Sequence, residues 1–183
     1  GADIIHISVP SSDIQIQTKL NKSREWVLEE LKKCISYAIN KGYKVTIGLE
    51  DASRADLRFL LRIIGTAFLE GVDRVRYADT VGILYRNKAF GEISRIKSEL
   101  NVEVEMHAHN DFGMAVANSI SAVKAGAEYI DCTIGGIGER AGNCDYTQFV
   151  TAAKGCLGVF EDINLNSLVQ TQKDIMNIIT KRN

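Results

Sequence analysis

The sequence predicts an α/β fold that forms part of a TIM-type (β/α)8 barrel. Strand-like runs alternate strictly with helical patterns, and the polar residues of these runs gather toward their C-terminal ends. Such alternation implies parallel strands joined by right-handed crossovers. The alternative is an open doubly wound sheet. No Gly-x-Gly-x-x-Gly motif follows any of the strands, which weakens the nucleotide-binding form of that alternative.

Five runs rich in apolar residues are the predicted strands, and helical patterns separate them. The strands are residues 4–9, 44–49, 74–79, 102–109 and 129–134. The first predicted helix begins after the N-cap Ser23 and ends at Gly42. The apolar stripes of the helices are Val27, Leu31, Ile35 and Ala38; Leu57, Leu60, Leu61, Ile64 and Phe68; Phe90, Ile93, Ile96 and Leu100; and Ala117, Ile120 and Val123. A last helix is predicted over residues 165–179.

Apolar residues occupy alternate positions of every predicted strand, so the residues between them share the opposite face. This second face carries a mixed polar set: His6, Ser8, Thr46, Gly48, Glu50, Arg76, Ala78, Thr80, Glu105, His107, His109, Asp131 and Thr133. Barrel enzymes build their sites from such residues at the C-terminal ends of the strands. A barrel of this kind needs eight strands, so we expect the rest of it to lie outside this chain.

The composition argues against several classes of function. The chain has 183 residues, is 25% charged and has a net charge of −1, so it lacks the electrostatic footprint of a nucleic-acid or membrane-surface protein. No apolar run approaches the ~18 residues that span a bilayer, and no secretory signal is expected. Four scattered cysteines without Cys-x-x-Cys spacing predict reduced thiols in a cytoplasmic protein. Because a strand follows Gly1 almost at once, we expect a piece of a longer protein or a chain whose natural start was removed.

The run over residues 102–113 is the most informative part of the chain. It alternates so that His107 and His109 project side by side from one face of a strand. Both rings can then reach one divalent metal ion without distortion of the backbone. A lone His-x-His more often lies on the surface or in the core without binding a metal ion, but the strand context and the following Asn110 and Asp111 favour a ligand pair.

Five motifs resemble those of the 2-isopropylmalate, homocitrate and citramalate synthase family, which shares its metal-dependent barrel with hydroxymethylglutaryl-CoA lyase. In family order they are residues 6–13, 50–54, 78–82, 107–118 and 136–144. The resemblance implies that the chain supplies strands four to eight of the barrel with their helices. It implies that residues 1–160 form this C-terminal part of the catalytic barrel and that residues 161–183 are the helical start of the post-barrel linker.

Within that family the chain is most similar to homocitrate synthases of nitrogenase cofactor assembly, through residues 6–14, 24–29 and 48–56. The resemblance implies an acyltransferase that removes a proton from the methyl group of acetyl-CoA and adds the carbanion to 2-oxoglutarate. Thioester hydrolysis then releases homocitrate and CoA. Open alternatives are 2-isopropylmalate synthase, citramalate synthase, a non-catalytic partner subunit of a split synthase and an excised piece of an ordinary enzyme. The lyase is disfavoured by Glu-Asp-Ala-Ser-Arg at residues 50–54.

The resemblance also implies a divalent metal ion (Mg, Mn, Zn or Fe) that holds and polarises the 2-oxo acid. Its ligands in this chain would be His107, His109 and Asn143, while an acidic ligand on the first barrel strand is not in this chain. For Asn143 the alternative is a turn residue after Gly142. The missing N-terminal barrel half would be a partner in the same polypeptide or in a separate subunit, within a homo- or hetero-oligomer.

The remaining site residues are also implied by the resemblance. Glu50 would take part in proton transfer, although a buried glutamate paired with an arginine is the alternative. Glu139, with Arg140, would brace the Gly-rich loop of the catalytic site. The predicted substrate-binding residues are His6, Thr80 and Arg54, with satisfaction of core polar groups as the alternative for His6 and Thr80. The chain departs from many relatives at Gly48, where they carry a serine that touches the substrate.

Overall fold

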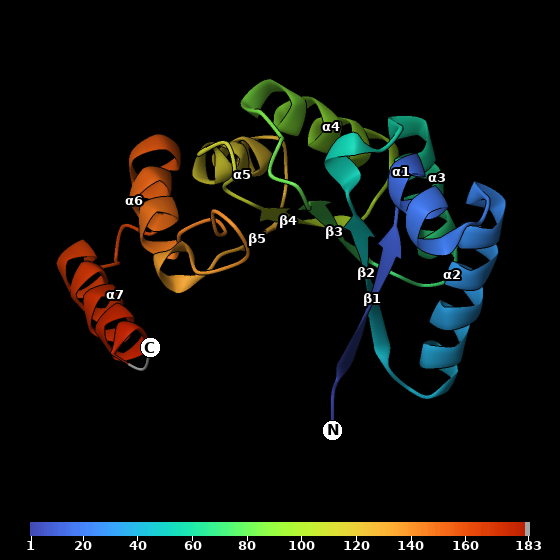
Figure 1. The fold of residues 1–183 in the computed structure, drawn as a ribbon, viewed down its shortest axis with the longest axis horizontal. Helices are drawn as coiled ribbons and strands as arrows, with labels where there is room; N and C mark the ends of the chain where they lie inside the picture. Colours follow the sequence, from blue (N-terminus) through green and yellow to red (C-terminus); the bar gives the residue numbers. More distant parts are fainter. Residues whose placement is uncertain (182–183) are drawn as a thin grey trace.

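The structure is a computed structural model, and it describes residues 1–181. Its strands form one parallel sheet in the order β1-β2-β3-β4-β5 (Figure 1). Their bounds are β1 Ile4–Pro10, β2 Lys44–Glu50, β3 Arg74–Asp79, β4 Glu103–Ala108 and β5 Tyr129–Asp131. The α/β class and the parallel strands are confirmed.

Seven α-helices accompany the sheet within residues 1–181, with short π and 3-10 segments η1 Ile16–Leu20, η2 Ala52–Arg54 and η3 Ile134–Gly136. Their bounds are α1 Asp13–Gln15, α2 Arg24–Asn40, α3 Leu57–Leu69, α4 Arg86–Glu99, α5 Ala115–Lys124, α6 Tyr146–Leu157 and α7 Leu165–Thr180. Helices α2 to α5 follow one another along one side of the sheet (Figure 1). Within the described residues, no helix has the length and apolar character needed to cross a membrane.

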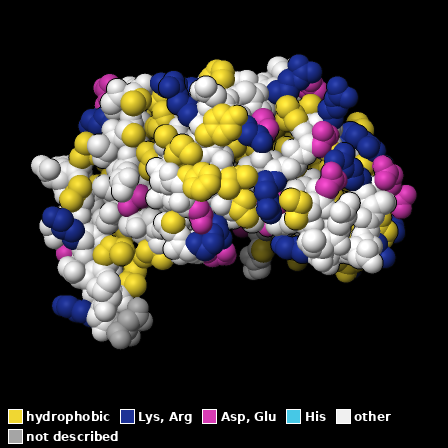
Figure 2. Space-filling view, turned by 45° about the horizontal axis from the view of Figure 1, so that its top comes forward, with side chains coloured by type: hydrophobic (Ala, Val, Ile, Leu, Met, Phe, Trp, Pro, Cys, Tyr) yellow, Lys and Arg dark blue, Asp and Glu magenta, His cyan; other side chains and the backbone are white. Residues whose placement is uncertain are grey.

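The helices cover the apolar face of the sheet, as alternation in the strands predicts. In α2 the Ser23 hydroxyl accepts from the Trp26 amide, and the predicted stripe from Val27 to Ala38 is buried. One hydrophobic core joins this stripe to the apolar residues of the strands. Figure 2 shows the outer surface of this layer, a band of apolar side chains flanked by charged ones, with no histidine in view.

The register confirms that the polar residues share the other face of the sheet. Paired positions on neighbouring strands are His6 with Thr46, Gly48 with Arg76, Arg76 with Glu105, Ala78 with His107 and His107 with Asp131. Parallel partners point to the same side, so these residues form one continuous surface. Tyr129, opposite Glu105, also belongs to this face, which the sequence did not predict.

Some predicted details are wrong. Phe68 and Phe90, predicted on buried stripes, are 41% and 46% exposed, and Ala117 is exposed as well. In α3 the buried face is instead centred on residues such as Phe59 and Ile63. The buried faces of α3 and α4 therefore keep part of the predicted stripes, such as Leu60, Ile64 and Ile93, but exclude the two phenylalanines.

The fifth strand is shorter than predicted, and one helix after it was missed. Beyond Asp131 the chain leaves β4, and the Thr133 amide donates to the Cys144 carbonyl. Helix α6 was not predicted, although Asp145 caps it by accepting from the Gln148 amide at 2.8 Å. An acidic N-cap three residues before a glutamine is a recognisable signal for a helix start.

Candidate active site

A polar cavity of about 350 Å³ lies at the C-terminal ends of the strands. Its lining residues are Glu50, Ala78, Thr80, His107, His109, Gly138, Glu139 and Asn143. The fold thus brings together all of the predicted site residues except His6 and Arg54. They come from the ends of β2, β3 and β4 and from the loop after β5, which is the arrangement that a barrel enzyme needs.

The two histidines of β4 stand edge to face, with ring centroids 4.8 Å apart. His107 Nδ1 lies 2.9 Å from an Asp131 carboxylate oxygen, and His109 Nδ1 lies 3.2 Å from the Asp79 carbonyl oxygen. Each ring is therefore held through Nδ1, and each Nε2 is left for another partner. Metal-binding histidines are commonly oriented in this way through the second ring nitrogen.

Asn143 adds an oxygen donor beside the histidines. Its backbone pairs with that of His109 in an isolated antiparallel β-bridge, and its side-chain amide nitrogen donates to the Ile137 carbonyl at 2.9 Å. Its side-chain oxygen is buried and has no hydrogen-bond partner among residues 1–181. A buried acceptor without a partner is costly unless a ligand completes it. Two free imidazole nitrogens and this oxygen form a donor set that suits a divalent cation.

The donor set is incomplete for a typical metal site. Within residues 1–181 no group of three or more His, Cys, Asp and Glu side chains could hold a metal ion.

The loop that carries Asn143 is closely packed, because a Cβ on Gly142 would collide with the Gly136 carbonyl oxygen. The Gly142 φ of +91° also favours glycine.

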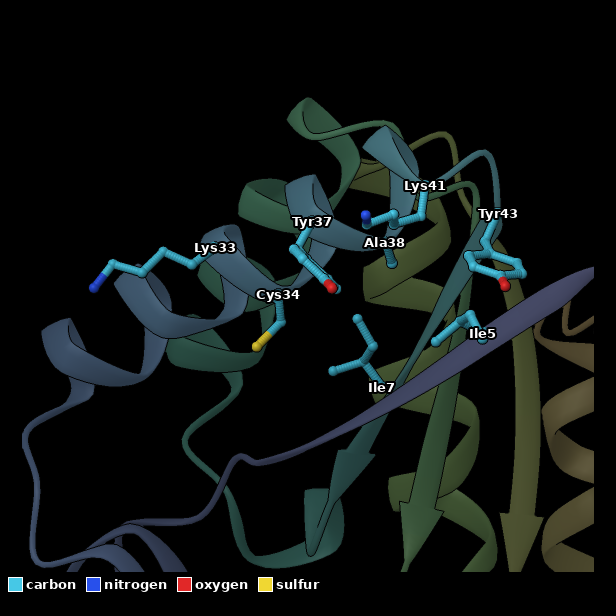
Figure 3. A pocket seen from close by; sticks show the side chains of 8 residues that line it. All are labelled: Ile5, Ile7, Lys33, Cys34, Tyr37, Ala38, Lys41 and Tyr43. Carbon is cyan, nitrogen blue, oxygen red and sulfur yellow. The ribbon is translucent and has the colours of Figure 1, made fainter.

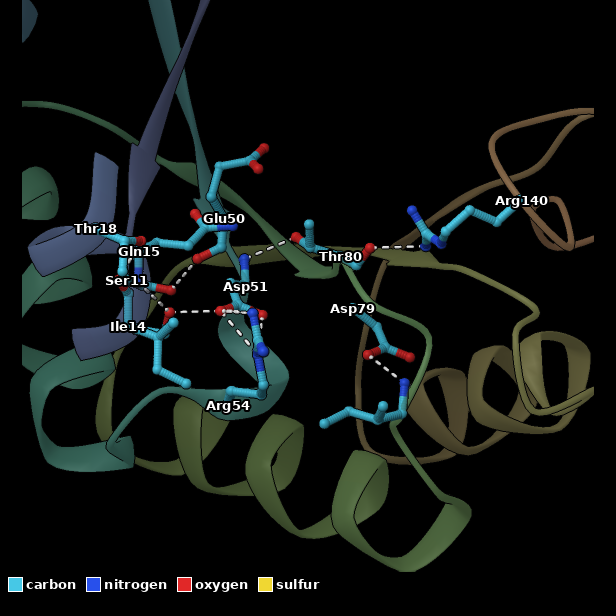
Figure 4. Close-up of polar contacts among 12 residues, drawn as sticks. Ser11, Ile14, Gln15, Thr18, Glu50, Asp51, Arg54, Asp79, Thr80 and Arg140 are labelled. Carbon is cyan, nitrogen blue, oxygen red and sulfur yellow. Dashed lines mark hydrogen bonds and ion pairs between the residues drawn. The ribbon is translucent and has the colours of Figure 1, made fainter. Parts of the chain in front are cut away.

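Glu50 and Asp51 point to opposite sides of the end of β2 (Figure 4). Glu50 faces the cavity and forms no ion pair within the described residues, so the alternative of a glutamate paired with an arginine finds no support. Asp51 is fully buried and pairs with Arg54 at 2.8 Å. Arg54 therefore turns away from the cavity, and a contact between Arg54 and substrate stays a prediction.

Thr80 and Arg140 connect the loops around the cavity. The Thr80 hydroxyl accepts from the Asp51 amide at 2.7 Å, which leaves its own proton free to donate. Arg140 donates to both carboxylate oxygens of Asp111 at 2.8 and 2.9 Å. It also donates to the Thr80 carbonyl at 2.9 Å, a contact that Figure 4 shows. This pairing lowers the pKa of Asp111.

Arg140 thus joins the loops that follow β3, β4 and β5. Within the described residues, the Glu139 side chain forms a hydrogen bond and ion pair only with Arg140, at 3.2 Å, and this side chain is 79% exposed. Arg140, and not Glu139, therefore makes the contacts that hold these loops together. A catalytic role for Glu139 stays a prediction.

His6 lies on the polar face but outside the cavity. Its Nδ1 is 2.8 Å from the Thr46 hydroxyl, and a Cβ added to Gly48 would lie 2.6 Å from its Nε2. The imidazole therefore occupies the space that a side chain at residue 48 would need. Partial burial, together with the charge of Arg76, lowers the pKa of His6.

A larger cleft, of about 480 Å³, has a different character. It lies between β1 and α2, and its walls include Ile5, Ile7, Tyr37 and Tyr43 (Figure 3). Lys33 and Lys41 are its charged residues, and it contains no carboxylate or imidazole. Its walls are mainly apolar, and it lies at the outer edge of the sheet beside β1.

Comparison with known proteins fits this geometry. The sequence pattern of the HMGL-like family matches residues 1–175. The chain belongs to the HMGL-like family. It is 50% identical over 185 residues to homocitrate synthase subunit alpha of Clostridium pasteurianum, a match that covers 98% of this chain and 67% of that protein.

A second relative, 2-isopropylmalate synthase 2 of Caldanaerobacter subterraneus, is 44% identical over 84% of this chain and 40% of its own length. The chain therefore spans about two thirds of the first relative and less than half of the second. Among solved structures, HMG-CoA lyase of Bacillus subtilis superposes with a TM-score of 0.82 at 18% identity, covering 98% of this chain and 64% of the lyase. The fold thus matches part of the lyase barrel.

Proposed function

We propose that the chain is a catalytic part of a homocitrate synthase, an acyltransferase that condenses acetyl-CoA with 2-oxoglutarate for nitrogenase cofactor synthesis. The observation that carries the proposal is the cavity in which His107, His109 and Asn143 offer free donor atoms beside Glu50 and Thr80. The 50% identity to a homocitrate synthase subunit supports this substrate pair over those of the sister synthases.

The proposed metal ligands in this chain are the Nε2 atoms of His107 and His109 and the side-chain oxygen of Asn143. Mg, Mn, Zn and Fe are the candidate ions, and a carboxylate from outside residues 1–181 would complete the set. When bound, a divalent cation would polarise the keto carbonyl of the 2-oxo acid as a Lewis acid.

The other residues of the cavity have proposed roles that follow from where they lie. Glu50 is free of ion pairs within residues 1–181 and reaches the cavity, so we assign it to transfer of the proton from the acetyl methyl group. The Thr80 hydroxyl retains a proton that it can donate to a carboxylate of the 2-oxo acid. The carbanion adds to the keto carbon, and a water molecule then cleaves the thioester to release CoA and homocitrate.

The proposed partner is the remaining part of the barrel, in the same polypeptide or in a separate subunit. In this proposal the chain provides strands four to eight within residues 1–160, and residues 161–183 begin the linker. No strand within residues 1–181 pairs with the outer edge of β1, and this edge, with the apolar cleft beside it (Figure 3), supports β1 as the place where the partner's strand and helix pack. The name of the Clostridium relative, a subunit alpha, supports a multi-subunit enzyme.

Four free cysteines fit the reducing cytoplasm, which we propose as the location of the protein.

CoA release from acetyl-CoA and 2-oxoglutarate, with added Mg²⁺ or Mn²⁺, tests the proposal. The chain is assayed alone and together with a separately produced N-terminal barrel half. We expect activity in the mixture and none with either part alone. Activity on 2-oxoisovalerate or pyruvate instead would identify 2-isopropylmalate or citramalate synthase. No CoA release with any of these 2-oxo acids would contradict a catalytic role and indicate a non-catalytic subunit.

A further inference from the structure

A chain of charged side chains crosses β3, β4 and β5 next to the histidine pair. Glu105 accepts from Arg76 at 2.7 Å, and Arg76 Nη2 lies 3.8 Å from an Asp131 carboxylate oxygen. The same Asp131 oxygen is 2.9 Å from His107 Nδ1. Asp131 is thus held between a guanidinium and the imidazole of a proposed metal ligand.

The register of the sheet produces this arrangement. Arg76 pairs with Glu105 across β3 and β4, and His107 pairs with Asp131 across β4 and β5. Parallel partners point to the same face, so the four side chains meet on the polar surface. The side chain of Glu105 is only 14% exposed, which separates this network from an ordinary surface ion pair.

The contact defines a tautomer of His107. A carboxylate only accepts hydrogen bonds, so Nδ1 must carry the proton of the Asp131 contact, and the Nε2 lone pair is then free. His109 is held differently, because its Nδ1 faces the backbone carbonyl of Asp79. Substitution of Asp131 cannot remove that carbonyl, so His109 is an internal reference within the same site.

We infer that Asp131 is a positioning residue that keeps His107 in its Nδ1–H tautomer with Nε2 turned toward the cavity, and that Arg76 and Glu105 hold the carboxylate in place. The inference rests on the proposed function, because a free Nε2 matters when the ring is a metal ligand. Mutation of such outer partners typically weakens metal binding by about 10- to 100-fold.

The first test reads the tautomers directly and needs no metal. The chain contains three histidines, so ¹⁵N-histidine labelling of this chain in the assembled protein gives three pairs of ring signals, one Nδ1 and one Nε2 signal for each ring, assigned by single His→Gln variants. At a pH where the rings are neutral, we expect His107 in the Nδ1–H form. In Asp131→Asn the amide can both donate and accept, so the Nε2–H form of His107 should rise while His109 stays unchanged. An Nε2–H form in the unmodified protein, or an unchanged His107 in the variant, would overturn the inference.

The second test is Mn²⁺ affinity, measured by electron paramagnetic resonance. We expect about 10- to 100-fold weaker binding in Asp131→Asn, recovery in Asp131→Glu, and no change in the control Glu103→Gln at the start of β4, the strand that carries His107. Unchanged affinity in Asp131→Asn would contradict the positioning role. If the unmodified protein binds no Mn²⁺, the proposed metal site fails, whereas the tautomer experiment still decides the role of Asp131. Asp131→Ser, which is too short to reach the ring, replaces the asparagine variant if that variant does not fold.

Discussion

The β4–β5 end and the β1 end of the sheet differ in how far contacts within this chain fix the surrounding loops and side chains. At the β4–β5 end, His107 and His109 are oriented through Nδ1, and Arg140 joins three loops. At the β1 end, no described strand pairs with the outer edge, and Tyr37 beside it is 68% exposed. The comparison teaches that contacts within this chain fix the orientation of the histidine pair, whereas His6, a proposed substrate-binding residue, lies on the edge strand that no described strand covers.

The largest effect is expected from a substitution in the tightly packed loop. Gly142→Ala would force an L-residue to φ +91° and bring a Cβ against the Gly136 carbonyl, so the free energy of unfolding should fall by about 2–4 kcal/mol. Urea unfolding measures it. The matched control is Gly42→Ala at the open end, which has a similar φ of +86° but no atom within 4 Å of the Cβ, and it should cost about 1 kcal/mol. Equal losses in the two variants would show that the packing of the loop does not matter.

The next largest effect should follow from removing the brace between the loops. Arg140→Met loses the contacts to Asp111 and the Thr80 carbonyl, so Asn143 is no longer held against the histidines. We expect Mn²⁺ affinity to fall by about 10-fold or more. Arg95→Met is the control, because among the described residues Arg95 forms an ion pair only with Glu99 on the surface of α4. Its Mn²⁺ affinity should equal that of the unmodified protein. A similar loss in both variants would refute a specific role of Arg140.

The sequence predicted which residues share the polar face of the sheet better than it predicted the contacts among their side chains. Alternation placed His107, His109 and Glu50 on one face, because the alternation of side chains along a strand is a local property. Asp131 was predicted on that face but not as the partner of His107, since the partner depends on the alignment of β4 with β5. Arg54 is a residue whose orientation the sequence did not predict. Its pairing with Asp51 depends on the αL conformation of Asp51, at φ 60°, which the motif did not reveal.

A smaller and more selective effect is expected at Gly48. Gly48→Ala would place a methyl group 2.6 Å from His6 Nε2, and the exposed ring can move away at little cost. We therefore expect a change in unfolding free energy below about 1 kcal/mol. In the assembled enzyme, KM for the 2-oxo acid should rise while Mn²⁺ affinity stays constant, because the histidine pair lies on β4. A loss of Mn²⁺ affinity would mean that the two ends of the sheet are not independent.

The smallest effect on the chain itself is expected from Tyr37→Ser in the cleft beside β1. Tyr37 is already largely exposed, so the unfolding free energy of the chain should change by less than about 0.5 kcal/mol. If the rest of the barrel covers this edge, association with the N-terminal half should weaken by about 10-fold, because an aromatic anchor is lost. Leu69→Ser is the matched control, since Leu69 is 84% exposed and lies outside the cleft, and its association should be unchanged. Equal weakening by both variants, measured by titration of one half with the other, would argue against β1 as the joining edge. Selective weakening by Tyr37→Ser would place the missing half of the site next to His6 and opposite the histidine pair.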